Sequence, residues 1–224
     1  MARVFLITRD QESSLITQEQ IKASNLSSVI YPLFKVRPIE ADLRGLKAGS
    51  EIIITSKNAL TFKDLDFWRK LNKQHKFLII GNNFSSYLEL SLIHNYQIFQ
   101  NSSVLYDYLE LNDKQYFYLR GEVISFDISS RVKNLIETIC YGIDYFYIDR
   151  ANIKSFIQKE SVSDLIFLSK ENAQNFLHIM GKDELQNYNI YCLSKRIAEV
   201  FSDFQSKLFY PESSNFAELV KLMK

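Results

Sequence analysis

The sequence predicts an α/β fold made of two similar, flavodoxin-like lobes with parallel sheets. The main observation is that one pattern occurs twice, 113 positions apart. The apolar run 52–54 leads into Thr-Ser-Lys-Asn-Ala at 55–59, and the apolar run 165–168 leads into Ser-Lys-Glu-Asn-Ala at 169–173. Both segments then enter a helical pattern. Two copies of one structural unit explain this repeat, and chance similarity between strand ends is the alternative.

The spacing downstream of the two segments is also equal. Twenty-five residues separate Ser56 from the next strand-to-helix junction, at Gly81, and the same interval separates Ser169 from Ser194. A matched interval across dissimilar stretches favours two copies over chance. We therefore expect the function to lie between two similar lobes.

Short apolar runs alternate with longer amphipathic stretches, which is typical of parallel α/β sheets. Helical patterns include 15–23, 59–71, 132–137 and 197–204. The runs between the helical patterns give ten predicted strands, or two sets of five: 3–8, 28–34, 51–55, 77–81, 96–99, 116–120, 139–147, 164–168, 188–193 and 207–210.

A third similarity assigns the strands to lobes. Residues 4–10 and 116–122 each form an apolar strand that closes on an arginine and an acid, followed by one helix and one strand. If the copies are equivalent, the first lobe is discontinuous and combines residues 1–36 with 148–224, and the second lobe is 37–147. Two segments then cross between the lobes. Pro38 lies in one of them, where a linker strand need not complete a ladder. The crossing segments predict a two-stranded bridge on which the lobes hinge.

Composition limits the classes of protein. The chain has 224 residues, of which 46% are hydrophobic and 24% charged, as expected for one large or two small globular domains. No apolar run approaches the ~18 residues of a membrane span. The opening run 4–7 is too short for a secretory leader, so we expect a cytoplasmic protein without a membrane partner. Its two cysteines lie in apolar segments, which argues against disulfides and thiolate metal sites. A net charge of +1 argues against nucleic-acid binding.

Polar residues gather where the strands are expected to end. Parallel sheets bind ligands beyond the carboxyl ends of their strands, where helix N-termini attract anions. Helix capping explains any one of these residues equally well. Each terminus contributes only ~0.3–1 kcal/mol, so a cluster of them predicts a ligand with many carboxylates. The residues are Ser56, Asn58, Asn82, Ser102, Ser169, Ser194, Ser213 and Ser214.

Familiar catalytic motifs are absent from the sequence. It contains neither G-x-G-x-x-G nor a Walker A motif, and its three histidines, His75, His94 and His178, have no metal-ligand spacing. Tyr145, at the expected lobe crossing, is the candidate acid. A phenol can donate a proton to a leaving hydroxyl or hold it by a hydrogen bond. The alternative is that Tyr145 only packs the hinge.

Seven short segments carry a family resemblance: 4–9, 54–59, 80–82, 119–121, 167–169, 193–198 and 211–214. Through these segments the chain resembles the uroporphyrinogen-III synthase family along its whole length and in order. The resemblance implies two α/β lobes with a discontinuous first lobe. The family's tyrosine lies about 25 positions beyond the arginine of its Arg-Gly segment, which corresponds to Tyr145, with Tyr141 and Tyr147 as neighbouring alternatives.

The resemblance implies a lyase (hydro-lyase) of haem biosynthesis without a cofactor or a metal. Its substrate would be hydroxymethylbilane, a linear tetrapyrrole polycarboxylate. Loss of the terminal hydroxyl gives an azafulvene cation, attack at the substituted carbon gives a spiro intermediate, and rearrangement inverts the last pyrrole ring. The bilane also cyclises unaided to the uninverted isomer, so the enzyme must impose one geometry. Nothing in the sequence demands a dimer, so we expect a monomer.

The resemblance and the strand-end pattern together give a set of candidate site residues. Tyr145 is the catalytic candidate. The segment 81–84, Gly-Asn-Asn-Phe, replaces the family's common Gly-Asn-Ala-Thr, so a threonine role does not transfer, although Ser85 is a substitute. Ser194-Lys195 replaces a usual Gly-Pro pair. The substrate-binding candidates are Arg9, Thr55, Ser56, Asn58, Gly81, Asn82, Arg120, Gly121, Ser169, Ser194, Lys195 and Ser213.

Two other functions fit parts of the pattern. A non-catalytic, two-lobed binding or regulatory module for a polycarboxylate would keep the serines and need no phenol. A periplasmic-type solute receptor is disfavoured by the missing signal sequence. Fold alone does not decide between these functions.

Overall fold

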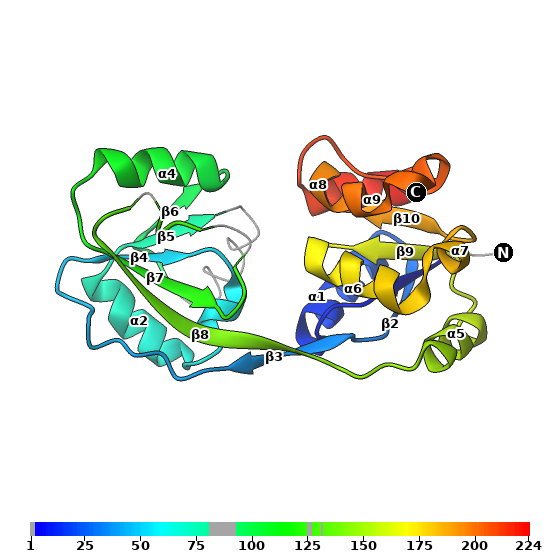
Figure 1. The fold of residues 1–224 in the computed structure, drawn as a ribbon, viewed down its shortest axis with the longest axis horizontal. Helices are drawn as coiled ribbons and strands as arrows, with labels where there is room; N and C mark the ends of the chain where they lie inside the picture. The colour runs from blue at the N-terminus through cyan, green and yellow to red at the C-terminus, as the bar shows by residue number, and fades with distance from the viewer. Residues whose placement is uncertain (1–2, 81–92, 125–126, 131) are drawn as a thin grey trace. The chain divides into compact units, whose positions relative to one another are not determined.

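The structure is a computed structural model that describes residues 3–80, 93–124, 127–130 and 132–224. It has a mixed α/β fold with two sheets in which parallel pairings dominate, which confirms the predicted fold class at this level. The chain divides into two compact units, Met1–Lys35 with Tyr145–Lys224, and Val36–Asp144. Figure 1 shows the elements of each unit.

The first unit contains a five-stranded sheet in the order β11-β10-β9-β1-β2. Each neighbouring pair is parallel. Strand β9 is central and its four residues are buried, as expected for a parallel strand covered on both faces. The strands are β1 (Val4–Ile7), β2 (Ser27–Ile30), β9 (Asp164–Phe167), β10 (Asn189–Cys192) and β11 (Leu208–Phe209).

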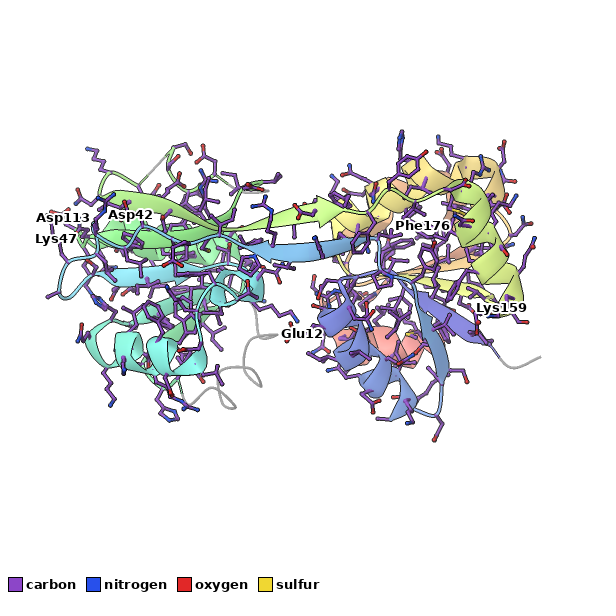
Figure 2. The ribbon with its side chains drawn as sticks, turned by 90° about the horizontal axis from the view of Figure 1, so that it is seen from below. Glu12, Asp42, Lys47, Asp113, Lys159 and Phe176 are labelled. Atoms are coloured by element: carbon purple, nitrogen blue, oxygen red, sulfur yellow. The ribbon has the colours of Figure 1, made fainter. Side chains whose placement is uncertain are left out.

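Helices cover both faces of this sheet. Ile21 of α1 and Leu219 of α9 pack in one core cluster with Phe5 and Ile166. On the other face, the Phe167 ring lies 5.3 Å from that of Phe176 in α6 and 4.9 Å from that of Phe201 in η3. Figure 2 labels Phe176 in this interior and, on the surface, the charged residues Glu12 and Lys159. The helices are α1 (Gln11–Lys22), α5 (Arg150–Lys159), α6 (Lys170–Met180), α7 (Lys182–Leu185), α8 (Lys195–Ala198), the 3₁₀ helix η3 (Glu199–Lys207) and α9 (Phe216–Met223).

The second unit contains a six-stranded sheet in the order β3-β8-β7-β4-β5-β6. The pairings from β8 through β6 are parallel. Strand β3 begins and strand β8 ends within the first unit, so both strands cross the boundary between the units. The strands are β3 (Phe34–Pro38), β4 (Glu51–Ile54), β5 (Phe77–Ile80), β6 (Tyr96–Phe99), β7 (Tyr116–Gly121) and β8 (Leu135–Tyr145).

Two core clusters hold the helices of the second unit on its sheet. Trp68 of α2 (Leu65–Gln74) is fully buried against Ile54 and Phe77, and its indole N–H donates to Leu60 O at 2.9 Å. On the opposite face, Leu105 and Leu109 of α4 (Ser102–Leu111) pack with other buried side chains. A 3₁₀ helix, η1 (Lys57–Leu60), follows β4.

Several element boundaries differ from the sequence prediction. The helix expected over 59–71 is instead η1 followed by α2, because the Asp64 carboxylate accepts from Phe67 N at 2.8 Å and starts the helix there. The helix expected over 132–137 is wrong, since β8 begins at Leu135 and pairs with β7. The strand expected over 28–34 ends at Ile30, and the chain forms β3 after it.

The two sheets have matching strand orders. In the first, β11-β10-β9-β1-β2 occupy the places that β6-β5-β4-β7-β8 occupy in the second. Asp164 opens β9 and is paired in register with Phe5, and Glu51 opens β4 and is paired with Tyr116. We call residues at equal distances from these two pairs counterparts.

Candidate functional site

In the first sheet, the direction of the connections between strands reverses between β1 and β9. Strand β1 leads to β2 on one side, whereas β9 leads to β10 on the other. Such switch points are where open parallel sheets bind ligands. Thr8 and Arg9 follow β1 at this point, and Ser169 follows β9.

Arg9 is a half-buried cation at this switch point. Burial lowers the pKa of its guanidinium, and the nearby Asp10 carboxylate opposes this shift. Asp10 itself is the N-cap of α1 and accepts from Ser13 N at 2.9 Å. Within the described part of the chain, no acidic side chain forms an ion pair with Arg9. The guanidinium is therefore partly desolvated, with Asp10 nearby but with no carboxylate of the described residues held in an ion pair with it.

Ser169 and Asn172 connect α6 to β1. The Ser169 hydroxyl accepts from Asn172 N at 3.3 Å, which makes Ser169 the N-cap of α6. The Asn172 amide donates to Thr8 Oγ1 at 2.8 Å. Asn172 is only 1% exposed, and its Oδ1 has no hydrogen-bond partner among the described atoms. Asn172 was not among the predicted site residues, and the only sequence signal for it was the asparagine repeated at positions 58 and 172.

The remaining candidates of the first unit lie near the same edge with fewer contacts. Ser194 precedes the four-residue helix α8, and its side chain makes no capping hydrogen bond. Lys195 and Ser213 are exposed. Asn215, rather than Ser213 or Ser214, caps α9, because its side chain accepts from Ala217 N at 2.8 Å.

The carboxyl edge of the second sheet reverses between β4 and β7. The hydroxyls of Thr55 and Tyr118 lie 3.0 Å apart, and the Ser56 hydroxyl accepts from Asn58 N at 3.3 Å. The helix that Ser56 caps is therefore a single 3₁₀ turn, shorter than expected. The cap of α4 is Asn101 instead of Ser102. The candidates Gly81 and Asn82, and residues 83–85, lie outside the described residues.

Arg120, the arginine of this second edge, faces a carboxylate. Its Nε lies 3.4 Å from Glu137 Oε2, and its Nη1 donates to Gly121 O at 2.9 Å. Both side chains are largely buried, at 19% and 24% exposure. Burial raises the pKa of the neighbouring Tyr118 phenol, the bond from Thr55 lowers it, and Glu137 raises it further. The charge of Arg120 is thus largely neutralised inside the unit.

Gly121 lies directly against the ring of Tyr141. A Cβ atom there would lie 2.8 Å from Tyr141 Cζ, a distance that real Cβ atoms do not show. The register of β7 and β8 shifts between Arg120 and Gly121, and the shift pairs Gly121 with Tyr141. The absence of a side chain at Gly121 is what lets the Tyr141 ring cross the strand.

Tyr145 ends β8 and is half-exposed, at 46%. Its ring lies 5.7 Å from that of Phe34. Burial raises the pKa of its phenol, and the charge of Glu171 adds to the shift. The group therefore stays protonated at neutral pH and can donate. The alternative, Tyr147, is 99% exposed.

Side chains that could bind a metal ion do not cluster in the parts of the chain that the structure describes. No group of three or more His, Cys, Asp or Glu residues there is arranged to hold an ion. His75 is buried, with Nδ1 3.0 Å from Ser50 O. The buried thiols of Cys140 and Cys192 are free. No described helix is long and apolar enough to cross a membrane.

Two doubly wound parallel sheets with polar carboxyl edges define a two-sheet α/β protein. The family model described as HEM4: Uroporphyrinogen-III synthase HemD matches residues 17–221. The chain belongs to this family, and it is a lyase of haem biosynthesis.

Solved structures of similar fold carry the same family name. The crystal structure of uroporphyrinogen-III synthetase from Helicobacter pylori 26695 is 16% identical, covers 100% of this chain and 98% of its own, and has a TM-score of 0.66. A mutant uroporphyrinogen III synthase from the extremely thermophilic bacterium Thermus thermophilus is 9% identical, with coverage of 100% and 97% and a TM-score of 0.57. At these identities the likeness shows the fold. No curated protein sequence matches the chain.

Proposed function

We propose that the chain closes hydroxymethylbilane to uroporphyrinogen III, with loss of water and inversion of the last pyrrole ring. The observation that carries this proposal is the family match over residues 17–221. The polar carboxyl edges of the two sheets support it, because they offer positions for the many carboxylates of a linear tetrapyrrole.

The proposed binding role divides between the two edges. In the first unit, Arg9 supplies charge and Ser169 caps an eleven-residue helix. Ser194 adds a hydroxyl that makes no capping hydrogen bond, and Lys195 adds an exposed ammonium. Ser213 is an exposed hydroxyl beside α9. In the second unit, the candidates are Thr55, Ser56, Asn58, Arg120 and the backbone at Gly121, together with Gly81 and Asn82.

Tyr145 is the proposed proton donor. The terminal hydroxyl of the bilane leaves as water if a donor supplies one proton, and the remaining chain becomes the azafulvene cation. The Tyr145 phenol is half-exposed, so a substrate can reach it, and its raised pKa keeps the proton in place before the reaction. The later ring closure asks mainly for positioning.

Finer features of the organisation are part of the same proposal. Strands β3 and β8 would form the two-stranded bridge between two similar lobes, because both cross the boundary of the compact units. A monomer in the cytoplasm, acting without nucleic acid, fits the two free thiols and the net charge of +1.

A coupled assay tests the proposed function. Hydroxymethylbilane is generated in place, and the oxidised porphyrin isomers are separated by chromatography with and without the protein. We expect the type III isomer to predominate. Type I product alone, from protein that circular dichroism shows to be folded, would instead support a non-catalytic binding module.

A further inference from the structure

Arg9 and Arg120 are counterparts in the two sheets. Phe5 and Tyr116 are each paired in register with the first residue of the central strand of their sheet. Arg9 lies four residues after Phe5, and Arg120 lies four residues after Tyr116. Arg9 follows the end of β1 and Arg120 is the next-to-last residue of β7, so each lies at the carboxyl end of the strand beside the central one, at the switch point of its sheet. Equal placement makes the difference between their surroundings informative.

The carboxylate that faces Arg120 has no equivalent in the first unit. In the second sheet, Tyr116 pairs with Leu135, and Glu137 lies two residues further along β8. In the first sheet, Phe5 pairs with Ser28, and Ile30 lies two residues further along β2. Ile30 is thus the counterpart of Glu137. Leu135 packs in the same cluster as Tyr116, and because side chains two residues apart share a face, Glu137 lies on that face too.

Ile30 lies on the corresponding face of the first sheet. Ile30 packs in one core cluster with Phe5 and Ile7. Arg9 lies two residues after Ile7 in the chain. The position that carries a carboxylate beside Arg120 therefore carries an aliphatic side chain in the first unit. Within the described ranges, the guanidinium of Arg9 forms no ion pair, whereas Nε of Arg120 lies 3.4 Å from Glu137 Oε2.

We infer that only one of the two counterpart arginines binds a substrate carboxylate. Arg9 anchors a carboxylate of the tetrapyrrole, whereas Arg120 has a structural role and pairs with Glu137 inside the second unit. The inference rests on the proposed function and refines it, because it removes Arg120 from the substrate-binding candidates. A half-buried guanidinium binds a carboxylate strongly, since partial desolvation reduces the competition from water.

Binding measurements with uroporphyrin III, an octacarboxylate, test the inference without turnover. Isothermal calorimetry at low and at high salt compares the wild type with Arg9→Gln and with the matched variant Arg120→Gln. We expect Arg9→Gln to raise Kd about tenfold at low salt, equivalent to about 1.4 kcal/mol, and to weaken the salt dependence. Arg120→Gln should change Kd less than about threefold and lower the midpoint of thermal unfolding.

A second pair of variants leaves Arg9 in place. Ile30→Glu supplies the carboxylate that the counterpart position carries, so it should neutralise Arg9 and reproduce the weaker binding of Arg9→Gln. Ile30→Gln, similar in size but neutral, is its control and should bind as the wild type does. Circular dichroism confirms that each variant is folded.

The outcomes separate the inference from the proposed function. Equal Kd changes in Arg9→Gln and Arg120→Gln, or a larger change in the latter, would overturn the inference even if the wild type makes the type III isomer. A wild type that makes only type I product, yet binds uroporphyrin through Arg9, would overturn the function and retain the charged anchor. Equal binding by Ile30→Glu and Ile30→Gln would also contradict the inference.

Discussion

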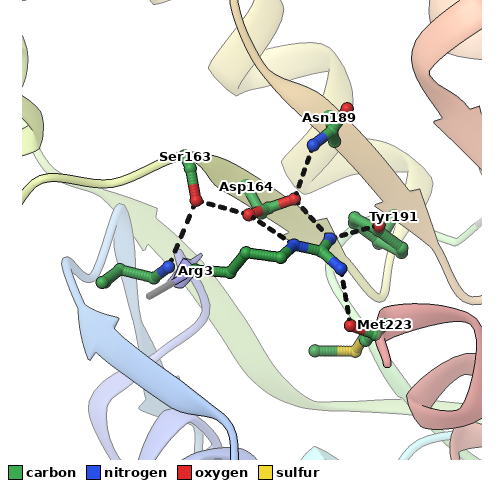
Figure 3. Close-up of polar contacts among 7 residues, drawn as sticks. Arg3, Ser163, Asp164, Asn189, Tyr191 and Met223 are labelled. Atoms are coloured by element: carbon green, nitrogen blue, oxygen red, sulfur yellow. Dashed lines mark hydrogen bonds and ion pairs between the residues drawn. The ribbon is translucent and has the colours of Figure 1, made fainter. Parts of the chain in front are cut away.

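Asp164 and Glu51 open the central strands of the two sheets, and each is a buried acid paired with a cation. Asp164 is fully buried and accepts from Arg3 Nη2 at 2.6 Å, and Glu51 Oε1 lies 2.7 Å from Lys114 Nζ. Arg3 and Lys114 are themselves counterparts, two residues before Phe5 and Tyr116. Figure 3 shows the Asp164 network. The opposite edge of each sheet from the candidate site is thus fixed by the same kind of ion pair.

The Asp164 network should carry a large share of the stability of the first unit. Asn189 and Ser163 also donate to its carboxylate, so Asp164→Asn disturbs four hydrogen bonds in a buried site. We expect a loss of roughly 2–4 kcal/mol, below the full value for a buried pair because Arg3 is 35% exposed. Denaturant unfolding followed by circular dichroism measures it.

An exposed ion pair provides the control for this prediction. Asp42 and Arg44 pair at 2.7 Å, but their side chains are 55% and 91% exposed. Asp42→Asn should leave the free energy of unfolding nearly unchanged, because water and salt screen an exposed pair. Losses of similar size in Asp42→Asn and Asp164→Asn would show that burial of the pair does not determine its contribution.

Local apolar patterns were sufficient to predict the parallel α/β fold. Residues 52–54 and 165–167 are completely buried, as expected for strands of a parallel sheet that helices cover on both faces. Helix starts were less predictable. The first turn after Ser56 is a 3₁₀ helix and α2 starts at Asp64, because a capping side chain competes with the periodic pattern around it.

The environment of the candidate site residues could not be predicted from sequence. Arg9 and Arg120 look alike in sequence, and their different partners follow from a strand pairing between β7 and β8 in a segment where a helix was expected. Glu137 lies in that segment. The buried amide of Asn172 also depends on a contact with Thr8, 164 residues away in the chain. Long-range register decides both cases.

Burial should protect both thiols of the folded protein. Burial raises the pKa of Cys140 and of Cys192 to about 12, so almost no thiolate forms near pH 8. The thiolate is the reactive form, and we expect Ellman's reagent to react slowly with the native protein and rapidly with both thiols after denaturation. Fast modification of either native thiol near pH 8 would contradict this prediction.

The raised pKa values of the two thiols also make the free energy of unfolding depend on pH. An unfolded cysteine ionises near pH 8.5, whereas the folded thiols stay protonated until about pH 12. The unfolded chain therefore binds fewer protons between these values, and the thiols' contribution to the free energy of unfolding falls as pH rises through that window. Replacing Cys192 with Ala should reduce the slope there, as denaturant unfolding at several pH values would show.

Gly121→Ala should strain the second sheet through its contact with the Tyr141 side chain. The new methyl group would lie 2.8 Å from Tyr141 Cζ, so the ring or the strand must move. We expect a loss of ~1–3 kcal/mol in the free energy of unfolding. In a double-mutant cycle, adding Tyr141→Ala should remove most of the penalty of Gly121→Ala, because the contact no longer exists. An additive double mutant would place the strain elsewhere.

Tyr145→Phe should lower turnover more than binding. The phenylalanine ring keeps the packing on Phe34 and loses only the proposed donor, so kcat should fall roughly 10- to 100-fold, at the lower end for proton donors because the bilane cyclises unaided. KM should change less than about threefold. Tyr147→Phe, at a 99% exposed position, is the control and should act as the wild type does. A loss confined to Tyr141→Phe would assign the donor to Tyr141.

The pH dependence of turnover tests the same donor independently. Burial and the charge of Glu171 raise the pKa of the Tyr145 phenol, so the proton needed for departure of the hydroxyl is present throughout the neutral range. Since the protonated form is the active one, kcat should be level around neutrality and should fall only above the usual tyrosine value of about 10. Tyr145→Phe should lose that alkaline decline while keeping its lower rate. An alkaline decline that persists unchanged in Tyr145→Phe would belong to another group, and Tyr145 would then serve only to pack against Phe34 where β3 begins and β8 ends.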